Sequence, residues 1–166
     1  MKTGIIVGRF QSPRLTHGHK DLIRKVISQC DKLIIFVGVY PLKPNFKNPL
    51  PFDVRRFMLY EFLPSHVLVS HHVKILPIVD VFNIPLWSNN LDNQIKELIS
   101  ENDEVTLYGS RDSFIFNYEG KYPTKEIVAS GNITATQLRK EIKNMDVGGV
   151  GEEFRKGIIW ALRDEA

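Results

Sequence analysis

The chain has 166 residues, 43% of them hydrophobic, which is enough for one domain with a substantial core. Its 22 basic and 19 acidic residues give a net charge of +3, and this near balance does not indicate a nucleic-acid-binding protein. The single cysteine, Cys30, excludes an internal disulfide framework and a Cys-x-x-Cys metal site. Because neither a signal-peptide core nor a run of about 18 apolar residues is found, we expect one cytoplasmic domain, residues 1–166, without nucleic-acid or membrane partners.

Short runs rich in Val and Ile alternate with segments of helical spacing. The runs predict strands at residues 4–7, 32–39, 73–79, 104–108 and 126–129. Apolar residues at helical spacing predict helices within 22–27, 52–62, 91–99, 137–143 and 152–162, with long loops at 40–51 and 108–124. This alternation predicts an α/β fold with an open, mostly parallel sheet and helices on both faces.

The stretch GRFQSPRLTHGH, residues 8–19, follows the first predicted strand and is rich in cationic and hydrogen-bonding side chains. Ligands of parallel sheets bind beyond the carboxyl ends of the strands, where helix amino termini also point. The first glycine allows a sharp turn, Arg9 and Arg14 offer forked cations, and a helix starting near residue 17 exposes amides suited to phosphate. His19 and the Thr16 hydroxyl are further candidate donors. The alternative is that Thr16 only caps the helix and the histidines lie at the surface.

A second stretch of this kind, GNITATQLRKEI, follows the last predicted strand. It places the hydroxyls of Thr134 and Thr136 before a predicted helix, with Arg139 one turn further along. By itself this is compatible with an ordinary threonine cap and a solvated arginine. Two such helix starts, after the first and last strands, favour one shared phosphate site.

These motifs resemble the signatures of the nucleotidylyltransferase superfamily. The segments concerned are GRFQ at 8–11, THGH at 16–19 and ITATQLR at 133–139. Within the superfamily the chain is most similar to nicotinamide mononucleotide (NMN) adenylyltransferases, as in the adenylyltransferase domain of bifunctional adenylyltransferase/Nudix proteins. Residues 47–55 and 80–87 resemble further motifs of that family. The resemblance implies a Rossmann-like fold.

Three departures from the family pattern are visible. The first loop is two residues longer than usual, Thr16 replaces a histidine, and Ala135 replaces a hydroxyl residue in the second motif. The chain also has no Nudix motif, so we do not predict a hydrolase activity.

The resemblance implies transfer of AMP from ATP to NMN, giving NAD and pyrophosphate by in-line attack without a covalent enzyme intermediate. Because the nucleophile is already an anionic phosphate, positioning and charge neutralisation carry the chemistry. Mg²⁺ would enter with ATP, and no metal site built from the protein's own side chains is expected. The implied catalytic residues are His19, Thr16 and Arg139. The implied ATP-binding residues are Gly8, Arg9, Phe10, Gly18, His19, Thr134, Thr136 and Arg139.

The expected acceptor-binding residues come from the middle of the chain and are Asp80, Phe82, Asn83, Trp87, Arg55 and Arg111. By resemblance Trp87 and Phe82 would stack on the nicotinamide ring. For Trp87 the alternative is a buried aromatic cluster, and for Arg55 a solvated position on its helix. Arg111 is expected on the ligand side of the sheet, with pairing to Asp112 as the alternative.

Two other functions remain open from the sequence. The same phosphate site could serve another acceptor, such as nicotinate mononucleotide or phosphopantetheine. A non-catalytic nucleotide-binding module is the second alternative, and the presence of His19 and Arg139 argues against it. A homo-oligomer is compatible with the sequence.

Overall fold

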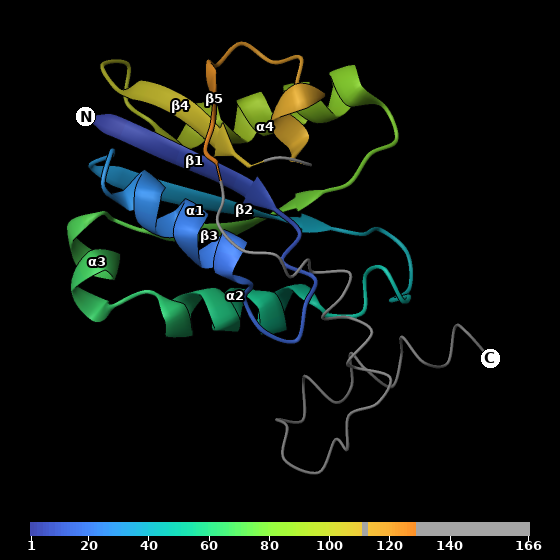
Figure 1. The fold of residues 1–166 in the computed structure, drawn as a ribbon. Coiled ribbons are helices and arrows are strands. Elements are labelled where there is room, and N and C mark those ends of the chain that lie inside the picture. The colour runs from blue at the N-terminus through green and yellow to red at the C-terminus, as the bar shows by residue number, and fades with distance from the viewer. Residues whose placement is uncertain (111–112, 129–166) are drawn as a thin grey trace.

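Five parallel strands form the sheet in the computed structural model, which describes residues 1–110 and 113–128 (Figure 1). They are β1 (Lys2–Gly8), β2 (Lys32–Val39), β3 (Lys74–Val79), β4 (Glu104–Gly109) and β5 (Thr124–Glu126), in the spatial order β3-β2-β1-β4-β5. All neighbouring strands in this order pair in parallel. The predicted open parallel sheet of Rossmann-like type is therefore confirmed.

Helices cover both faces of the sheet (Figure 1). The helices α1 (His17–Ile27), α2 (Phe52–Phe62) and α3 (Ser65–Ser70) pack on one face. The helix α4 (Ile84–Leu98) and the 3₁₀ turn η1 (Phe114–Phe116) pack on the other. This division follows from right-handed crossovers, because the chain moves from β1 to β3 in one direction and then returns past β1 to β4.

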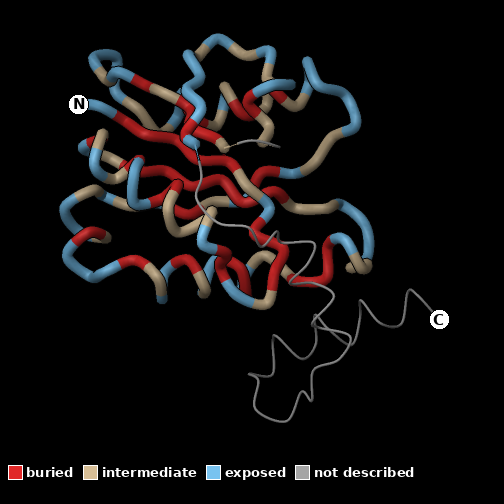
Figure 2. The backbone as a smooth tube through the Cα atoms, in the orientation of Figure 1, coloured by how far each residue is buried: buried red, intermediate tan, exposed pale blue. Residues whose placement is uncertain are grey.

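The core consists of two apolar layers, one on each face of the sheet. Alternate residues of β1 point to opposite faces, so Ile6 packs with α1 while Ile5 and Val7 pack with α4. Figure 2 shows that buried residues continue along the central strands and that the exposed ones lie mainly at the periphery. Full burial on both faces explains why these strands are continuous Val and Ile runs rather than alternating patterns.

Several boundaries differ from the sequence-based prediction. The helix α3 was not predicted, because its six residues are too few to show a helical pattern of apolar positions. Helix α4 begins at Ile84, well before the predicted segment, and strand β5 begins at Thr124. The 3₁₀ turn η1 lies inside the predicted long loop 108–124, while the loop at 40–51 contains no helix or strand. The predicted helices 137–143 and 152–162 lie outside the described residues.

The strand order creates a topological switch between β1 and β4. From β1 the chain turns to β2 on one side, and it reaches β4 on the other side only after β3 and α4. The register places Gly8 beside Val37 and Ile6 beside Tyr108, so the carboxyl ends of these strands lie at one edge. Ligands of open α/β sheets bind at such a switch, and the connections leaving this edge are where the site is expected.

Candidate active site

Helix α1 begins with a reciprocal pair of hydrogen bonds between Thr16 and His19. The Oγ1 atom of Thr16 accepts from the backbone amide of His19 at 3.1 Å, and the backbone amide of Thr16 donates to Nδ1 of His19 at 3.2 Å. Together they form a capping box in which histidine takes the place of the usual Glu or Gln. Thr16 is therefore the N-cap, as the alternative from the sequence proposed. His19 is held by the helix start, whereas His17 is exposed.

Burial and the capping box together define the charge and the tautomer of His19. Burial lowers the pKa of His19 from 6.5 to about 4, so the imidazole is neutral near pH 7. A neutral imidazole carries one proton, and Nδ1 is already an acceptor from the Thr16 amide. The proton is thus on Nε2, which makes His19 a neutral hydrogen-bond donor through that nitrogen.

Phe10 supports the His19 ring from the preceding loop. The two rings meet edge to face, with centroids 5.0 Å apart and planes at 62°. Phe10 is 3% exposed and has a φ of 51°, so the left-handed residue of this turn is Phe10, whereas the sharp turn was expected at Gly8. The reason for glycine at position 8 is instead contact: a Cβ there would lie 2.9 Å from the Phe10 ring.

Arg9 is fixed by two side chains from other parts of the sheet edge. Its Nη2 lies 2.9 Å from Oδ2 of Asp80, and its Nη1 donates to Oδ1 of Asn48 at 2.8 Å. Asp80 follows β3, and Asn48 belongs to the loop after β2, so the contacts join three connections at the carboxyl edge. The Arg9 side chain still keeps 53% of its surface exposed, and its charge is accessible to an anion.

Arg55, on α2, lies beneath this ion pair and is 2% exposed. Its Nη1 donates to the backbone carbonyls of Arg9 at 2.7 Å and of Gly38 at 2.6 Å, which ties α2 to the ends of β1 and β2. Burial, with a contribution from nearby Arg9, lowers the pKa of Arg55 to about 10, so it remains charged near pH 7. The alternative of a solvated helix arginine is wrong, because the side chain reaches back to these carbonyls.

The lengthened first loop is held against the loop after β2. Gln11 forms two hydrogen bonds with the backbone of Leu50: Nε2 donates to the carbonyl at 3.0 Å, and Oε1 accepts from the amide at 2.8 Å. Ser12 is fully buried, and its hydroxyl donates to the carbonyl of Arg14 at 2.6 Å. Gln11 and Asn48 were not among the predicted site residues. Their place in the motifs was visible, but their partners are distant in sequence.

Four of the acceptor residues expected from the sequence, Asp80, Phe82, Asn83 and Trp87, lie in the turn between β3 and α4 or in the first turn of α4. Asn83 is the N-cap of α4, and its Oδ1 accepts from the backbone amide of Leu86 at 2.9 Å. Phe82 is 87% exposed. Trp87 is half-buried against the α4-side core and meets the Phe114 ring at 5.8 Å and 60°. Trp87 thus belongs to an aromatic cluster and keeps part of its surface accessible.

The remaining predicted site residues cannot be placed relative to these groups. Thr134, Thr136, Arg139 and Arg111 lie outside the described residues, so the second phosphate motif remains an expectation. Within residues 1–110 and 113–128, the structure brings Arg9, Asp80 and Arg55 together, and it joins Thr16, His19 and Phe10 at the start of α1.

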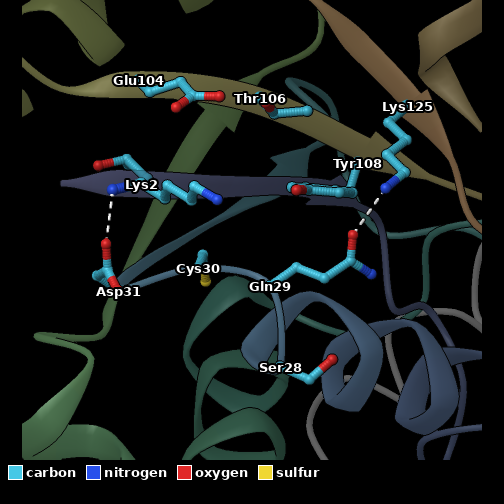
Figure 3. Close-up of a pocket in the computed structure, with 10 residues that line it drawn as sticks. Lys2, Ser28, Gln29, Cys30, Asp31, Glu104, Thr106, Tyr108 and Lys125 are labelled. Atoms are coloured by element: carbon cyan, nitrogen blue, oxygen red, sulfur yellow. Dashed lines mark hydrogen bonds between the residues drawn. The ribbon is translucent and has the colours of Figure 1, made fainter.

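A separate polar pocket begins at the opposite, amino-terminal ends of the strands, beside the end of α1 (Figure 3). Two hydrogen bonds join residues that line it: the Lys2 amide donates to Oδ2 of Asp31, and Lys125 Nζ donates to Oε1 of Gln29, each at 2.8 Å. This pocket is not part of the candidate site. Among the described residues, no group of three or more His, Cys, Asp and Glu residues is placed to hold a metal ion. That part of the chain also has no helix both long enough and apolar enough to cross a membrane.

The fold and the groups at the carboxyl edge of the sheet define a Rossmann-like α/β domain. The start of helix α1, which is suited to binding an anion, lies at its topological switch. A family model described as cytidylyltransferase-like matches residues 5–143, and the chain belongs to this family.

Sequence relatives and a solved structure agree with this assignment. The chain is 27% identical over 88 residues to a nicotinamide-nucleotide adenylyltransferase of Picrophilus torridus, covering 53% of this chain and 50% of the relative. It is 32% identical over 106 residues to one of Sulfurisphaera tokodaii, covering 64% and 58%. The fold is similar, with a TM-score of 0.73 and 24% identity, to a bifunctional NMN adenylyltransferase/ADP ribose pyrophosphatase from Francisella tularensis, solved with AMP and a manganese ion. That match covers 92% of this chain and 43% of the other. The chain spans about half the length of the curated relatives it matches.

Proposed function

We propose that the protein is an adenylyltransferase that transfers AMP from ATP to NMN, giving NAD and pyrophosphate. The observation that carries the proposal is the capping box of α1, which holds His19 as a neutral donor at the carboxyl end of β1. Membership of the cytidylyltransferase-like family and the adenylyltransferase names of the archaeal relatives support the reaction class.

In this reaction His19 donates its Nε2 hydrogen to a non-bridging oxygen of the α-phosphate, where negative charge increases as the nucleophile attacks. A neutral donor keeps its proton throughout, so it stabilises charge without acting as an acid. The first-turn amides of His17 and Gly18 have no carbonyl partner within the helix and add the positive end of the helix dipole. The Thr16 hydroxyl accepts the cap hydrogen bond and can still donate its own proton to a phosphate oxygen, while the Thr16 amide fixes the His19 ring.

Arg9 provides a positive charge in a fixed position for binding the nucleotide phosphates. Asp80 and Asn48 fix its guanidinium while leaving half of the side chain exposed. Arg55 supports the same edge from below through backbone carbonyls, and its charge adds to the positive potential there. Thr134, Thr136 and Arg139 are proposed to bind the β- and γ-phosphates, and Arg111 a phosphate or nucleotide.

The divalent cation, Mg²⁺ in our proposal, enters as part of the nucleotide substrate. The donor set fits this assignment, because Asp80 is paired with Arg9 and the described residues offer no carboxylate cluster for a resident ion. Phosphate oxygens and water then supply the ligands that Mg²⁺ prefers.

NMN is proposed as the acceptor, with its nicotinamide ring on the accessible face of Trp87 at the start of α4. Phe82 and Asn83 border this place, although Asn83 has its side-chain oxygen engaged as the helix cap. The reaction needs small-molecule substrates only, and we place it in the cytoplasm.

The test is a matrix of nucleotides and acceptors. ATP and CTP are each supplied with Mg²⁺ and with NMN, nicotinate mononucleotide or phosphopantetheine, and pyrophosphate release is measured together with product mass. The proposal predicts the highest kcat/KM for ATP with NMN. Release with another acceptor would keep the phosphate site and remove the nicotinamide assignment. If the protein binds ATP but no acceptor causes pyrophosphate release, a non-catalytic binding module would be favoured.

A further inference from the structure

The connection between η1 and β5 is attached to helix α4 by hydrogen bonds to two α4 side chains. The Tyr118 hydroxyl donates to Oδ1 of Asp92, and the Lys121 amide donates to Oδ2 of the same carboxylate at 2.9 Å. The Glu119 amide donates to Oγ of Ser88 at 3.0 Å, and Ser88 is 1% exposed. Both carboxylate oxygens of Asp92 are thus used to hold one short segment of chain.

Tyr118 is the centre of this attachment. Its hydroxyl donates to Asp92 and also accepts from the Tyr122 amide at 3.2 Å. Burial and the hydrogen bond to Asp92 both raise the pKa of Tyr118, so the hydroxyl keeps its proton and remains a donor at all physiological pH values. The ring is therefore fixed at its polar end.

An aromatic series leads from Tyr118 to the proposed acceptor site. The Tyr118 ring meets Phe114 at 6.2 Å and 73°, and Phe114 meets Trp87 at 5.8 Å and 60°. Both contacts are edge to face, a geometry that favours one relative orientation of the rings. All three rings pack against the α4-side core, which contains Val7 of β1 next to the topological switch.

We propose that Tyr118 and Asp92 are positioning residues for the acceptor: they fix Phe114, which in turn fixes the orientation of the Trp87 indole that receives the acceptor's aromatic ring. The inference rests on the proposed function for the identity of that ring. It adds that acceptor affinity depends on a hydrogen bond that lies two rings away from Trp87. Stacking depends on ring offset and orientation. If Phe114 no longer fixed the Trp87 ring, the acceptor would bind less well, while ATP binding would be unaffected.

The kinetic test compares Tyr118→Phe with Tyr60→Phe. Tyr118→Phe keeps the ring and removes the hydroxyl, while Tyr60 is on α2, is 38% exposed and serves as the matched control. We expect Tyr118→Phe to raise the KM for NMN about three- to fivefold with the KM for ATP changed less than about twofold, corresponding to loss of roughly one hydrogen bond. Asp92→Asn keeps an oxygen for the tyrosine hydroxyl and should give a smaller rise than Asp92→Ala.

A second readout does not depend on activity. The protein is labelled with 5-fluorotryptophan, and the Trp87 resonance is assigned in the ¹⁹F spectrum with Trp87→Phe. Without any substrate, Tyr118→Phe should shift or broaden this resonance, and Tyr60→Phe should leave it unchanged. An unchanged resonance in Tyr118→Phe would overturn the proposal. Equal rises in both KM values with a large fall in Tm would also overturn it, because they would indicate general damage.

The two proposals fail in different ways. If the unmodified protein makes no NAD from NMN and ATP, the proposed function fails, and the acceptor role of this cluster fails with it. If NAD is made but the Trp87 resonance and the KM for NMN are indifferent to Tyr118→Phe, the positioning role alone fails.

Discussion

The Nδ1 atom of His19 accepts a hydrogen bond from the backbone amide of Thr16, while the Thr16 hydroxyl accepts one from the amide of His19. One pair of residues therefore starts helix α1 and selects the imidazole tautomer. Replacing His19 by alanine would remove the side-chain half of the capping box together with the imidazole, and would mix a loss of stability with a loss of chemistry. A useful variant has to separate them.

His19→Gln makes this separation. Glutamine is one of the usual residues at this position of a capping box, so the helix start is kept while the imidazole donor is lost. We expect kcat to fall about a hundredfold or more, the scale for one preorganised donor to a developing oxyanion. The rate is measured at saturating ATP and NMN, with Tm as the check on folding.

The control for this variant is His17→Ala. His17 is exposed at the first position of α1 and should change kcat little. A folded His19→Gln protein with the turnover of the parent would exclude His19 from the chemistry.

The low pKa of His19 predicts a pH-dependent stability. The folded-state pKa is about 4 and the reference value is 6.5, so between these values the unfolded chain binds the proton more strongly than the folded one. Its contribution to stability is complete above pH 6.5 and is lost as the pH falls towards 4. Urea unfolding at intervals from pH 7 to 4 should show a smaller decrease in His19→Gln than in the parent. An NMR titration of His19 with a midpoint near 6.5 in the folded protein would contradict this account.

Arg55→Lys should destabilise the protein. Lysine cannot reproduce the guanidinium geometry that serves the carbonyls of Arg9 and Gly38, and both the Arg55 side chain and its hydrogen bond to Gly38 are buried. We expect a loss of about 2 kcal/mol in the free energy of unfolding, the usual scale for hydrogen bonds to a charged group. The neighbouring Arg56→Lys is the control: Arg56 is exposed and pairs with exposed Asp53. Equal effects of the two substitutions would show that the buried contacts contribute nothing measurable.

The sequence predicted the sheet and the start of α1 because those features depend on local patterns. Buried parallel strands require apolar runs, and Thr16 ahead of an apolar helical pattern is a local cap signal. The sequence could not show that Arg55 is buried, since its partners are main-chain carbonyls at the ends of β1 and β2. The ion pair of Arg9 with Asp80 was missed for the same reason: it exists only once β1 and β3 end at the same edge.

Helix α4 shows how a functional interpretation can obscure a structural one. Asn83 was assigned to acceptor binding, but the residue is also an N-cap followed by Pro85 in the first turn, a standard helix start. Thr16 was likewise assigned either as a helix cap or as a phosphate ligand. Its side chain forms the cap, and its phosphate role stays a prediction.

Trp87→Ala tests the acceptor site directly. Loss of a stacked ring worth about 1 kcal/mol should raise the KM for NMN roughly fivefold and change the KM for ATP little. Trp87 also contacts Phe114, so the Tm of the variant must be measured alongside the two substrate titrations. A large fall in Tm with both KM values raised equally would assign Trp87 to the core and not to the acceptor.

The most direct test of the central claim follows the α-phosphate itself. The protein is incubated with Mg²⁺, NMN and ATP carrying ³²P at the α-position, and the products and the protein are separated. Our account predicts that the label appears in NAD, in equal amount to the pyrophosphate released, with none bound covalently to the protein. Label in free AMP, label retained on the protein, or label remaining in ATP would contradict it.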